Sequence, residues 1–169
     1  MDKIKLSSSF WFIIITFILT GLIIWGVVNI EAAREKKISE QTSREVALSC
    51  TTDMATRFHI HPKLKILILG KEEVIPANTG INGLCMHSIH THDATGLLHV
   101  EAPVKKDFTL GDFFAVWGKT FNKEQILDST VDNKHVLHMS VNGQDTDAYE
   151  NYVVQDKDQI IISYEEIKK

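Results

Sequence analysis

The chain has 169 residues, with 18 Lys and Arg against 22 Asp and Glu, and a formal net charge of −4 at neutral pH. No basic cluster alternates with aromatic side chains, so the composition argues against nucleic-acid binding. Glycine and proline are sparse and no low-complexity tract occurs, which excludes fibrous and largely disordered classes.

The first predicted element is a membrane anchor. Residues 10–30 carry no charged side chain, and Trp11 and Trp25 lie near the two ends, where indole rings favour the membrane interface. A helix rises about 1.5 Å per residue, so this segment matches a hydrocarbon core of about 30 Å. A cleaved signal peptide has a shorter apolar region that ends in small residues, whereas Glu31 follows here. We therefore predict a retained transmembrane anchor over residues 10–30, after a short cytoplasmic tail over residues 1–9.

Basic residues flank the anchor on both sides, which leaves its orientation open. A count of Lys and Arg alone slightly favours the C-terminal side inside the cell, whereas the net charge of the flanks favours the N-terminus inside. We place the C-terminal domain outside, because its two cysteines suit an oxidising compartment. The expected localisation is the cell membrane, with one span and the lipid bilayer as its surroundings.

Two further segments follow the anchor. Residues 31–49 are highly charged with few large apolar side chains, which predicts a helical stalk. Residues 50–169 have the usual length of one domain, and we expect this domain to be extracytoplasmic and β-rich.

The first half of the domain is predicted to consist mainly of strands. Residues 58–76 alternate apolar and polar side chains after Pro62 and turn at Gly70, which predicts a hairpin. The segment "GLLHVEAP" predicts a short strand that ends at Pro103.

Helices are predicted in the middle of the domain and strands at its end. "TLGDFFAVWG" predicts a helix with Thr109 as N-cap and Gly118 as its stop, and we expect Phe113, Val116 and Trp117 on its buried face. "NKEQILD" predicts a second short helix. The Asn142-Gly143 pair predicts a hairpin, and "DKDQIIISYE" a last strand. This order indicates an α+β fold with a mixed or antiparallel sheet, and the tail resembles β-grasp modules.

Two cysteines, Cys50 and Cys85, allow two interpretations. In an oxidising compartment they would form a disulfide that closes a loop of about 35 residues. Alternatively, Cys85 is a free thiolate that binds a metal beside the neighbouring histidines.

Histidines dominate the remaining signal. His59 and His61 are separated by one residue, as are His90 and His92, and such residues point to the same side of an extended chain. On neighbouring strands, opposed residues have Cβ atoms about 4.5–5.5 Å apart, so four imidazoles could share one ion. Imidazole nitrogens bind both zinc and copper. We predict a metal site at these four histidines, with Asp93 as an extra ligand or as a hydrogen-bond partner that orients a ring.

Other residues near these pairs are spare candidates for the site: His87, His99, Glu101 and Cys85. An interpretation without a metal also stands, because "HTHDATG" can form a turn that Asp93 and Thr95 close. Two His-X-His pairs together with further histidines favour the metal. His135 and His138 are expected to be ordinary strand residues.

Two stretches carry a resemblance: "HIHPKL…IP…GI…C…HTHDATGLLHVE" and "FTLGDFFAVWG". Over most of residues 50–165 they resemble a group of small, single-span extracytoplasmic proteins of archaea and bacteria. With its anchor, the chain is also similar to membrane proteins of ammonia-oxidising archaea, cells that depend on copper enzymes such as ammonia monooxygenase. The resemblance implies a topology, favours copper and suggests membership of a membrane protein complex, but it implies no reaction.

Three functions are compatible with these patterns. The first is a membrane-anchored extracytoplasmic metal-binding protein, for copper rather than zinc, that holds or delivers the ion or serves as an accessory subunit of a membrane metalloenzyme. The second is a structural or interaction module whose histidines bind no metal. The third is a zinc-dependent hydrolase, but no HExxH, Ser-His-Asp or phosphate-loop pattern supports catalysis, and we assign no catalytic residue.

Overall fold

The structure, a computed structural model, describes residues 8–52 and 56–167. The chain divides into two compact units, one that ends at Glu40 and one that begins at Gln41. Residues 1–7, which make up most of the predicted cytoplasmic tail, lie outside the described residues.

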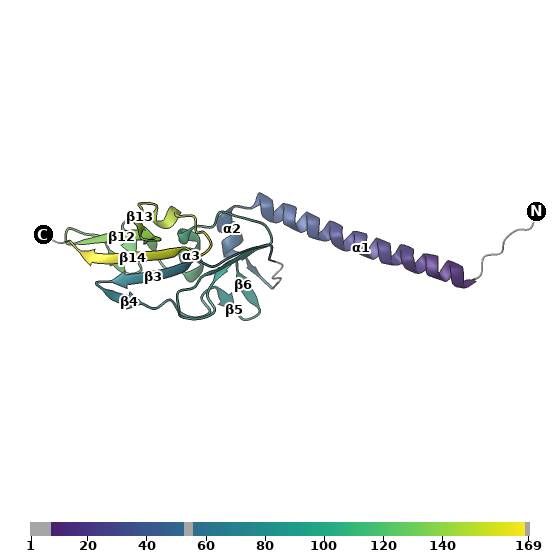
Figure 1. The fold of residues 1–169 in the computed structure, drawn as a ribbon, viewed down its shortest axis with the longest axis horizontal. Helices are drawn as coiled ribbons and strands as arrows, with labels where there is room; N and C mark the ends of the chain where they lie inside the picture. Colours follow the sequence, from purple (N-terminus) through teal and green to yellow (C-terminus); the bar gives the residue numbers. More distant parts are fainter. Residues whose placement is uncertain (1–7, 53–55, 168–169) are drawn as a thin grey trace, which may run out of the picture. The chain divides into compact units, whose positions relative to one another are not determined.

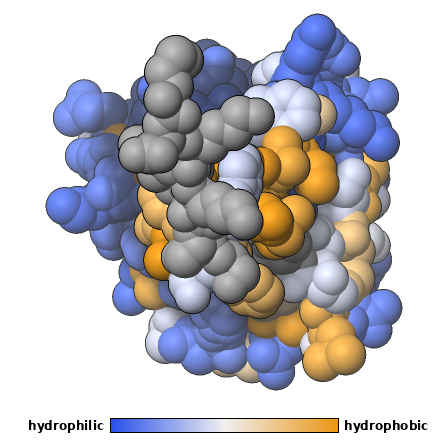
Figure 2. Space-filling view, turned by 90° about the vertical axis from the view of Figure 1, so that its right-hand side faces the viewer, coloured by the Kyte–Doolittle hydropathy of each residue, from blue (hydrophilic) through white to orange (hydrophobic). Residues whose placement is uncertain are grey.

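The first unit consists of helix α1 (Ser8–Glu40). Within the described residues, α1 is the one helix whose length and apolar composition would let it cross a membrane. Most of its large apolar side chains between Phe10 and Ile30 are exposed. Figure 2 shows hydrophobic surface, in orange, on the face that it views. Polar side chains within this segment bond to their own helix, as where Thr16 Oγ1 donates to the carbonyl of Phe12 at 2.8 Å. Such internal bonding suits a helix in lipid, where water is absent.

The predicted stalk is divided between the two units. Its first part continues α1 to Glu40, whereas its last part forms helix α2 (Ser43–Leu48) of the second unit. Thr42 and Glu45 form a capping box at the start of α2, and Ala47 is fully buried.

A five-stranded sheet forms one side of the second unit (Figure 1). Its strand order is β13-β12-β14-β3-β4, in which β14 runs parallel to β3 and every other pair is antiparallel. The hairpins β12-β13 and β3-β4 thus flank β14, and this mixed sheet confirms the α+β prediction. The strands are β3 (Lys63–Ile68), β4 (Lys71–Glu73), β12 (His135–Val141), β13 (Gln144–Asp145) and β14 (Gln159–Glu166).

Alternating side chains of this sheet form the domain core. Positions i and i+2 of each strand point to one face, and the large apolar residues of that face are buried. They are Leu64, Ile66, Leu137, Met139, Ile160 and Ile162. The Asn142-Gly143 turn between β12 and β13 has φ values of 52° and 79°, as its sequence predicted.

Helix α3 (Leu110–Trp117) contributes the aromatic part of the core. It begins at the predicted N-cap, Thr109, which forms a capping box with Asp112, and ends at Gly118, which has a left-handed φ of 70°. Its buried face differs from the prediction, because Phe114 is buried with Phe113, whereas Val116 and Trp117 are only half-buried.

The predicted second helix is wrong. Its residues form two-residue strands that pair in the order β11-β10-β9. The side chain of Asn122 accepts from the backbone N–H of Glu124 at 2.8 Å, so it closes a turn instead of capping a helix. These strands are β9 (Phe121–Asn122), β10 (Gln125–Ile126) and β11 (Ser129–Thr130).

Two small sheets complete the domain, together with a short 3₁₀-helix, η1 (Tyr149–Asn151). The first sheet, in the order β1-β6-β5, contains β1 (Cys50–Thr51), β5 (Ile81–Asn82) and β6 (Cys85–His87). The second, in the order β2-β8-β7, contains β2 (Phe58–Ile60), β7 (Ile89–His90) and β8 (His99–Ala102). The predicted hairpin over residues 58–76 is therefore split between two sheets, and only β3 and β4 form it.

Candidate metal centre

The sheet β2-β8-β7 brings most of the histidines together. Strand β8 lies between β2 and β7, so the two His-X-His pairs are not on neighbouring strands as we predicted. His59 lies opposite Glu101, and His90 lies opposite His99. Opposed residues share a face, and so do residues i and i+2 of one strand. The register therefore places these four side chains on one face.

His61 and His92 lie just beyond their strands, and hydrogen bonds of the surrounding chain hold them there. The N–H of His61 donates to the Asp156 carboxylate at 3.0 Å. Thr91, which precedes His92, is fully buried and donates from Oγ1 to the carbonyl of Pro76 at 2.8 Å. These bonds fix the chain at both pairs, so that the imidazoles can be positioned before any ion binds.

His99 is the centre of the arrangement. Its ring centroid lies 4.5 Å from that of His92 and 4.7 Å from that of His61. The rings of His90 and His59 lie 5.6 and 5.9 Å away. The sequence suggested His99 only as a spare candidate, although its spacing from Glu101 on a predicted strand placed both on one face.

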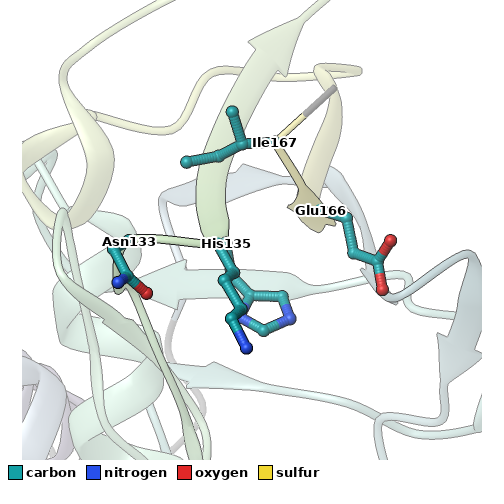
Figure 3. Close-up of a pocket in the computed structure, with 5 residues that line it drawn as sticks. Asn133, His135, Glu166 and Ile167 are labelled. Atoms are coloured by element: carbon teal, nitrogen blue, oxygen red, sulfur yellow. The ribbon is translucent and has the colours of Figure 1, made fainter. Parts of the chain in front are cut away.

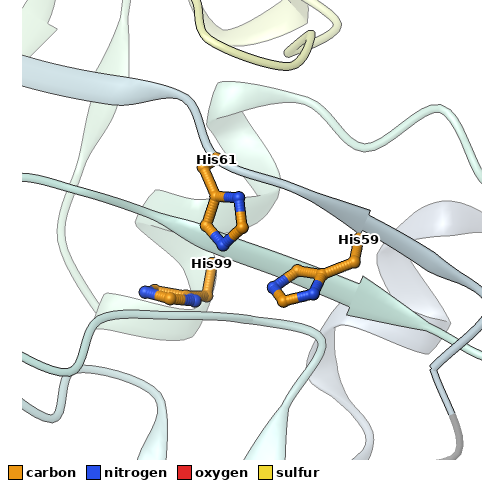
Figure 4. A group of neighbouring side chains, drawn as sticks. All are labelled: His59, His61 and His99. Carbon is orange, nitrogen blue, oxygen red and sulfur yellow. The ribbon is translucent and has the colours of Figure 1, made fainter.

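Two groups of three histidines could hold a metal ion. One contains His59, His61 and His99, whose rings face one another in Figure 4, and the other contains His90, His92 and His99. Within each group the ligand atoms all lie within 4.8 Å of one another. Among the described residues these are the groups found, so the predicted four-histidine set is replaced by two triads that share His99. We call the five histidines together the histidine cluster.

His90 is held in the tautomer that a metal requires. Its Nδ1 lies 2.9 Å from the carbonyl oxygen of His87, and a carbonyl can only accept, so Nδ1 carries the proton. Nε2 then carries the lone pair that can bind an ion, and in the metal-free protein it accepts a hydrogen bond from His92. This Nε2 lies 3.2 Å from Nε2 of His92. Two nitrogens bound to one ion at about 2.0–2.1 Å are about 2.8–3.4 Å apart at square or tetrahedral angles, so the spacing suits a shared ion.

Glu101 orients the other triad. Its Oε1 lies 2.9 Å from Nε2 of His59, so that nitrogen donates and Nδ1 of His59 is left for an ion. The same oxygen lies 3.8 Å from Nδ1 of His99. Nδ1 of His99 is buried and has no hydrogen-bond partner among the described residues. A buried polar atom in this position suggests a ligand that the protein itself does not supply.

Burial keeps the inner imidazoles neutral. Desolvation is the largest effect on His90, which is fully buried, and it lowers the pKa of this residue. The hydrogen bond to His87 and the charge of Glu101 raise the pKa in part, and the imidazoles of His92 and His59 lower it. Desolvation also lowers the pKa of His99, followed by the effects of His92, His61 and His90. Neutral imidazole is the form that binds metals, so the lowered pKa values of His90 and His99 favour metal binding at these two residues.

Asp93 lies outside both triads. Its Oδ1 accepts hydrogen bonds from the N–H of Thr95 at 2.9 Å and from Oγ1 of Thr95 at 2.5 Å. These bonds are the main cause of its lowered pKa, to which His99 and His92 add. Asp93 therefore closes the turn before β8, and its charge lies close enough to the cluster to favour a cation there.

Two spare candidates serve other purposes. Cys85 is joined to Cys50 in a disulfide with a Cα–Cα distance of 5.4 Å, so it offers no free thiolate. Nδ1 of His87 donates to the carbonyl of Ala47 at 3.0 Å and thereby bonds β6 to α2. Neither residue belongs to a triad.

A shallow pocket at the ends of β12 and β14 is a weaker candidate site (Figure 3). It has a volume of about 360 Å³ and includes His135 and Glu166 in its lining. Nδ1 of His135 is bonded to Asp132 at 2.9 Å, and its ring stacks on Tyr164. His135 is thus a strand residue with satisfied contacts, as the sequence indicated.

Comparison with models of protein families, with curated proteins and with solved structures finds no match for this chain.

Proposed function

We propose that this protein is a membrane-anchored, extracytoplasmic metal-binding protein whose histidine cluster holds copper. The observation that carries the proposal is the convergence of two His-X-His pairs on His99, on one face of the sheet β2-β8-β7. Five imidazoles so close together would repel one another once protonated, and their arrangement is accounted for by a cation that they share.

Copper is favoured over zinc by the chemistry of the donors. The cluster offers imidazole nitrogens and one carboxylate, and such sites bind Cu²⁺ more tightly than Zn²⁺. The disulfide removes Cys85 as a soft ligand, so the cluster favours Cu²⁺ over Cu⁺. Zinc is the alternative occupant.

The disulfide and the apolar helix α1 support an extracytoplasmic compartment. A structural disulfide is typical of proteins outside the cytosol, and α1 would tether the domain to the membrane. In this position the protein would hold or deliver copper, or act as an accessory subunit of a membrane metalloenzyme such as an ammonia monooxygenase. The last suggestion depends on the resemblance noted from the sequence.

Catalysis is a weaker candidate function. A triad of histidines leaves a coordination position for water on Zn²⁺, and Glu101 is the nearest carboxylate that could act as a base. Its Oε1 is bonded by His59, however, which favours an orienting role. Hydrolysis by the zinc-loaded protein that Glu101→Gln abolishes, with metal content unchanged, would favour the enzyme.

The test is the metal content of the full-length chain. The protein is purified in detergent without a histidine tag, loaded with Cu²⁺ or Zn²⁺ at pH 7.5, desalted and analysed for metal. We expect stoichiometric copper in the wild type and a large loss in His99→Ala. His138→Ala is the matched control, because His138 is an exposed histidine of β12 outside the cluster. Equal metal retention by His99→Ala and wild type, or no retention by either, would overturn the proposal.

A further inference from the structure

We infer that the histidine cluster holds two metal ions and that the imidazole of His99 bridges them. This inference rests on the proposed function, since it requires that the cluster binds metal. It adds the number of ions, the assignment of each histidine pair to its own ion, and the ligand that the two ions share.

His99 lies between the two histidine pairs. It belongs to both triads, and its distances to the two sides are nearly the same, with ring centroids 4.7 Å from His61 and 4.5 Å from His92. An imidazole has two nitrogens at separate edges of the ring, so one ring can bind an ion at each. A histidine that served one ion alone would have no reason to lie midway between two pairs.

The two histidine pairs start from strands that are not neighbours in the sheet. Strands β2 and β7 lie on opposite sides of β8, and neighbouring strands are about 4.7–4.9 Å apart, so the two pairs start about 9–10 Å from each other. Nitrogens on one ion are at most about 4.2 Å apart. His99 and Glu101 occupy the face between the pairs. Among the described residues no group of four histidines has all its ligand atoms within 4.8 Å of one another, so the geometry favours one ion for each pair.

The two ring nitrogens of His99 face different histidine pairs. Nδ1 lies 3.8 Å from Oε1 of Glu101, and that oxygen is bonded to His59, so Nδ1 belongs to the His59 side. Figure 4 shows one nitrogen of His99 facing His59 and His61 and the other directed away from them. That second nitrogen, Nε2, is left for the ion of His90 and His92. Nδ1 is also the buried atom without a hydrogen-bond partner, which an ion would supply.

The proton balance is simple. Neutral His99 carries one ring proton, and the first ion binds at the nitrogen that lacks it. The second ion replaces the remaining proton, which passes to solvent, and His99 becomes an imidazolate with one ion on each nitrogen. No oxidant or reductant is required.

The experiment titrates Cu²⁺ into the full-length protein in detergent and measures bound copper together with the intensity of the electron paramagnetic resonance spectrum. We expect the wild type to bind two Cu²⁺ with far less signal than two isolated ions give, because an imidazolate bridge couples their spins. His61→Ala and His92→Ala each remove one site, so each variant should bind one Cu²⁺ with full signal. His138→Ala should behave as the wild type.

The outcomes separate this inference from the proposed function. Binding of one Cu²⁺ by the wild type, or of two with additive signal, would overturn the bridge while leaving the metal-binding function intact. Binding of no copper and no zinc by the wild type would overturn both.

Discussion

The guanidinium of Arg44 lies 2.9 Å from the nearly buried carboxylate of Asp112 and joins helix α2 to helix α3. Arg44 also donates to the carbonyl of Gly111 at 2.8 Å. Asp112 accepts a hydrogen bond from the N–H of Thr109, the N-cap of α3. One carboxylate therefore caps α3 and holds the segment that follows α1.

Arg44→Met should destabilise the domain. The change leaves the nearly buried Asp112 carboxylate with only its hydrogen bonds at the start of α3. Because Arg44 is half exposed, solvent screens part of the ion pair, and we expect a loss of about 1–3 kcal/mol in the free energy of unfolding. Urea unfolding of the full-length protein measures it. Lys123→Met, at an exposed ion pair, is the control and should change little. Equal stability of the two variants would show that Arg44 contributes no more than a surface charge.

Gly96→Ala should destabilise the turn that leads from Asp93 to β8. Gly96 has a φ of 78°, and an added Cβ would clash with the backbone of Leu64. Gly70→Ala is a matched control, because Gly70 has a φ of 80° but open space around it. Both variants bear the conformational cost of about 1–2 kcal/mol, and only Gly96→Ala bears the clash. Urea unfolding should therefore rank Gly96→Ala as clearly less stable, and the opposite order would contradict the packing described here.

Removal of the disulfide should affect stability and leave metal binding intact. The bond joins residues separated by 35 positions, for which loop closure gives about 3–4 kcal/mol. Cys50→Ser/Cys85→Ser should lose stability of this order and retain the copper content of the wild type. Peptide mapping of native protein under non-reducing conditions should find the linked pair. A loss of copper in a variant that remains folded would make Cys85 a ligand.

Stability of the metal-free protein should decrease as pH falls. The pKa values of His90 and His99 are lower in the folded chain, so below about pH 6.5, the ordinary histidine value, the unfolded chain binds more protons. The free energy of unfolding must then fall as pH decreases through this range. Urea unfolding at pH 7.5 and pH 5 measures the change, which should be smaller in His90→Gln. An unchanged pH dependence in that variant would show that His90 does not cause it.

Local signals predicted much of the fold. The Thr109 cap, the Gly118 stop and the Asn142-Gly143 turn depend on backbone bonds within a few residues, so their sequences specify them. The apolar alternation in β3 likewise predicted a strand, because it reflects one buried face. The prediction of a second helix was wrong because the Asn122 side chain accepts a hydrogen bond from the N–H of Glu124 and closes a turn. Such a turn competes with helix capping.

The sequence predicted that the histidines would converge, but not how they are arranged. The two His-X-His pairs lie on one face, as expected, yet the order β2-β8-β7 places His99 between them. Strand order and register depend on pairing between distant segments, and no local pattern in "GLLHVEAP" specifies its neighbours. For the same reason the turn bonds of Asp93 and the bond from His87 to Ala47 could not be read from spacing alone.

The parallel pairing of β3 with β14 bears on how the protein is made. These strands come from opposite ends of the domain sequence, yet together they form the centre of its largest sheet. During synthesis the chain therefore carries β3, the cysteines and every histidine of the cluster before its central strand exists. Such non-local contacts slow folding and leave apolar surface exposed meanwhile, so the emerging domain is a natural client for chaperones on the side of the membrane where it folds. A chain that stopped before Gln159 would lack the strand that joins the two hairpins.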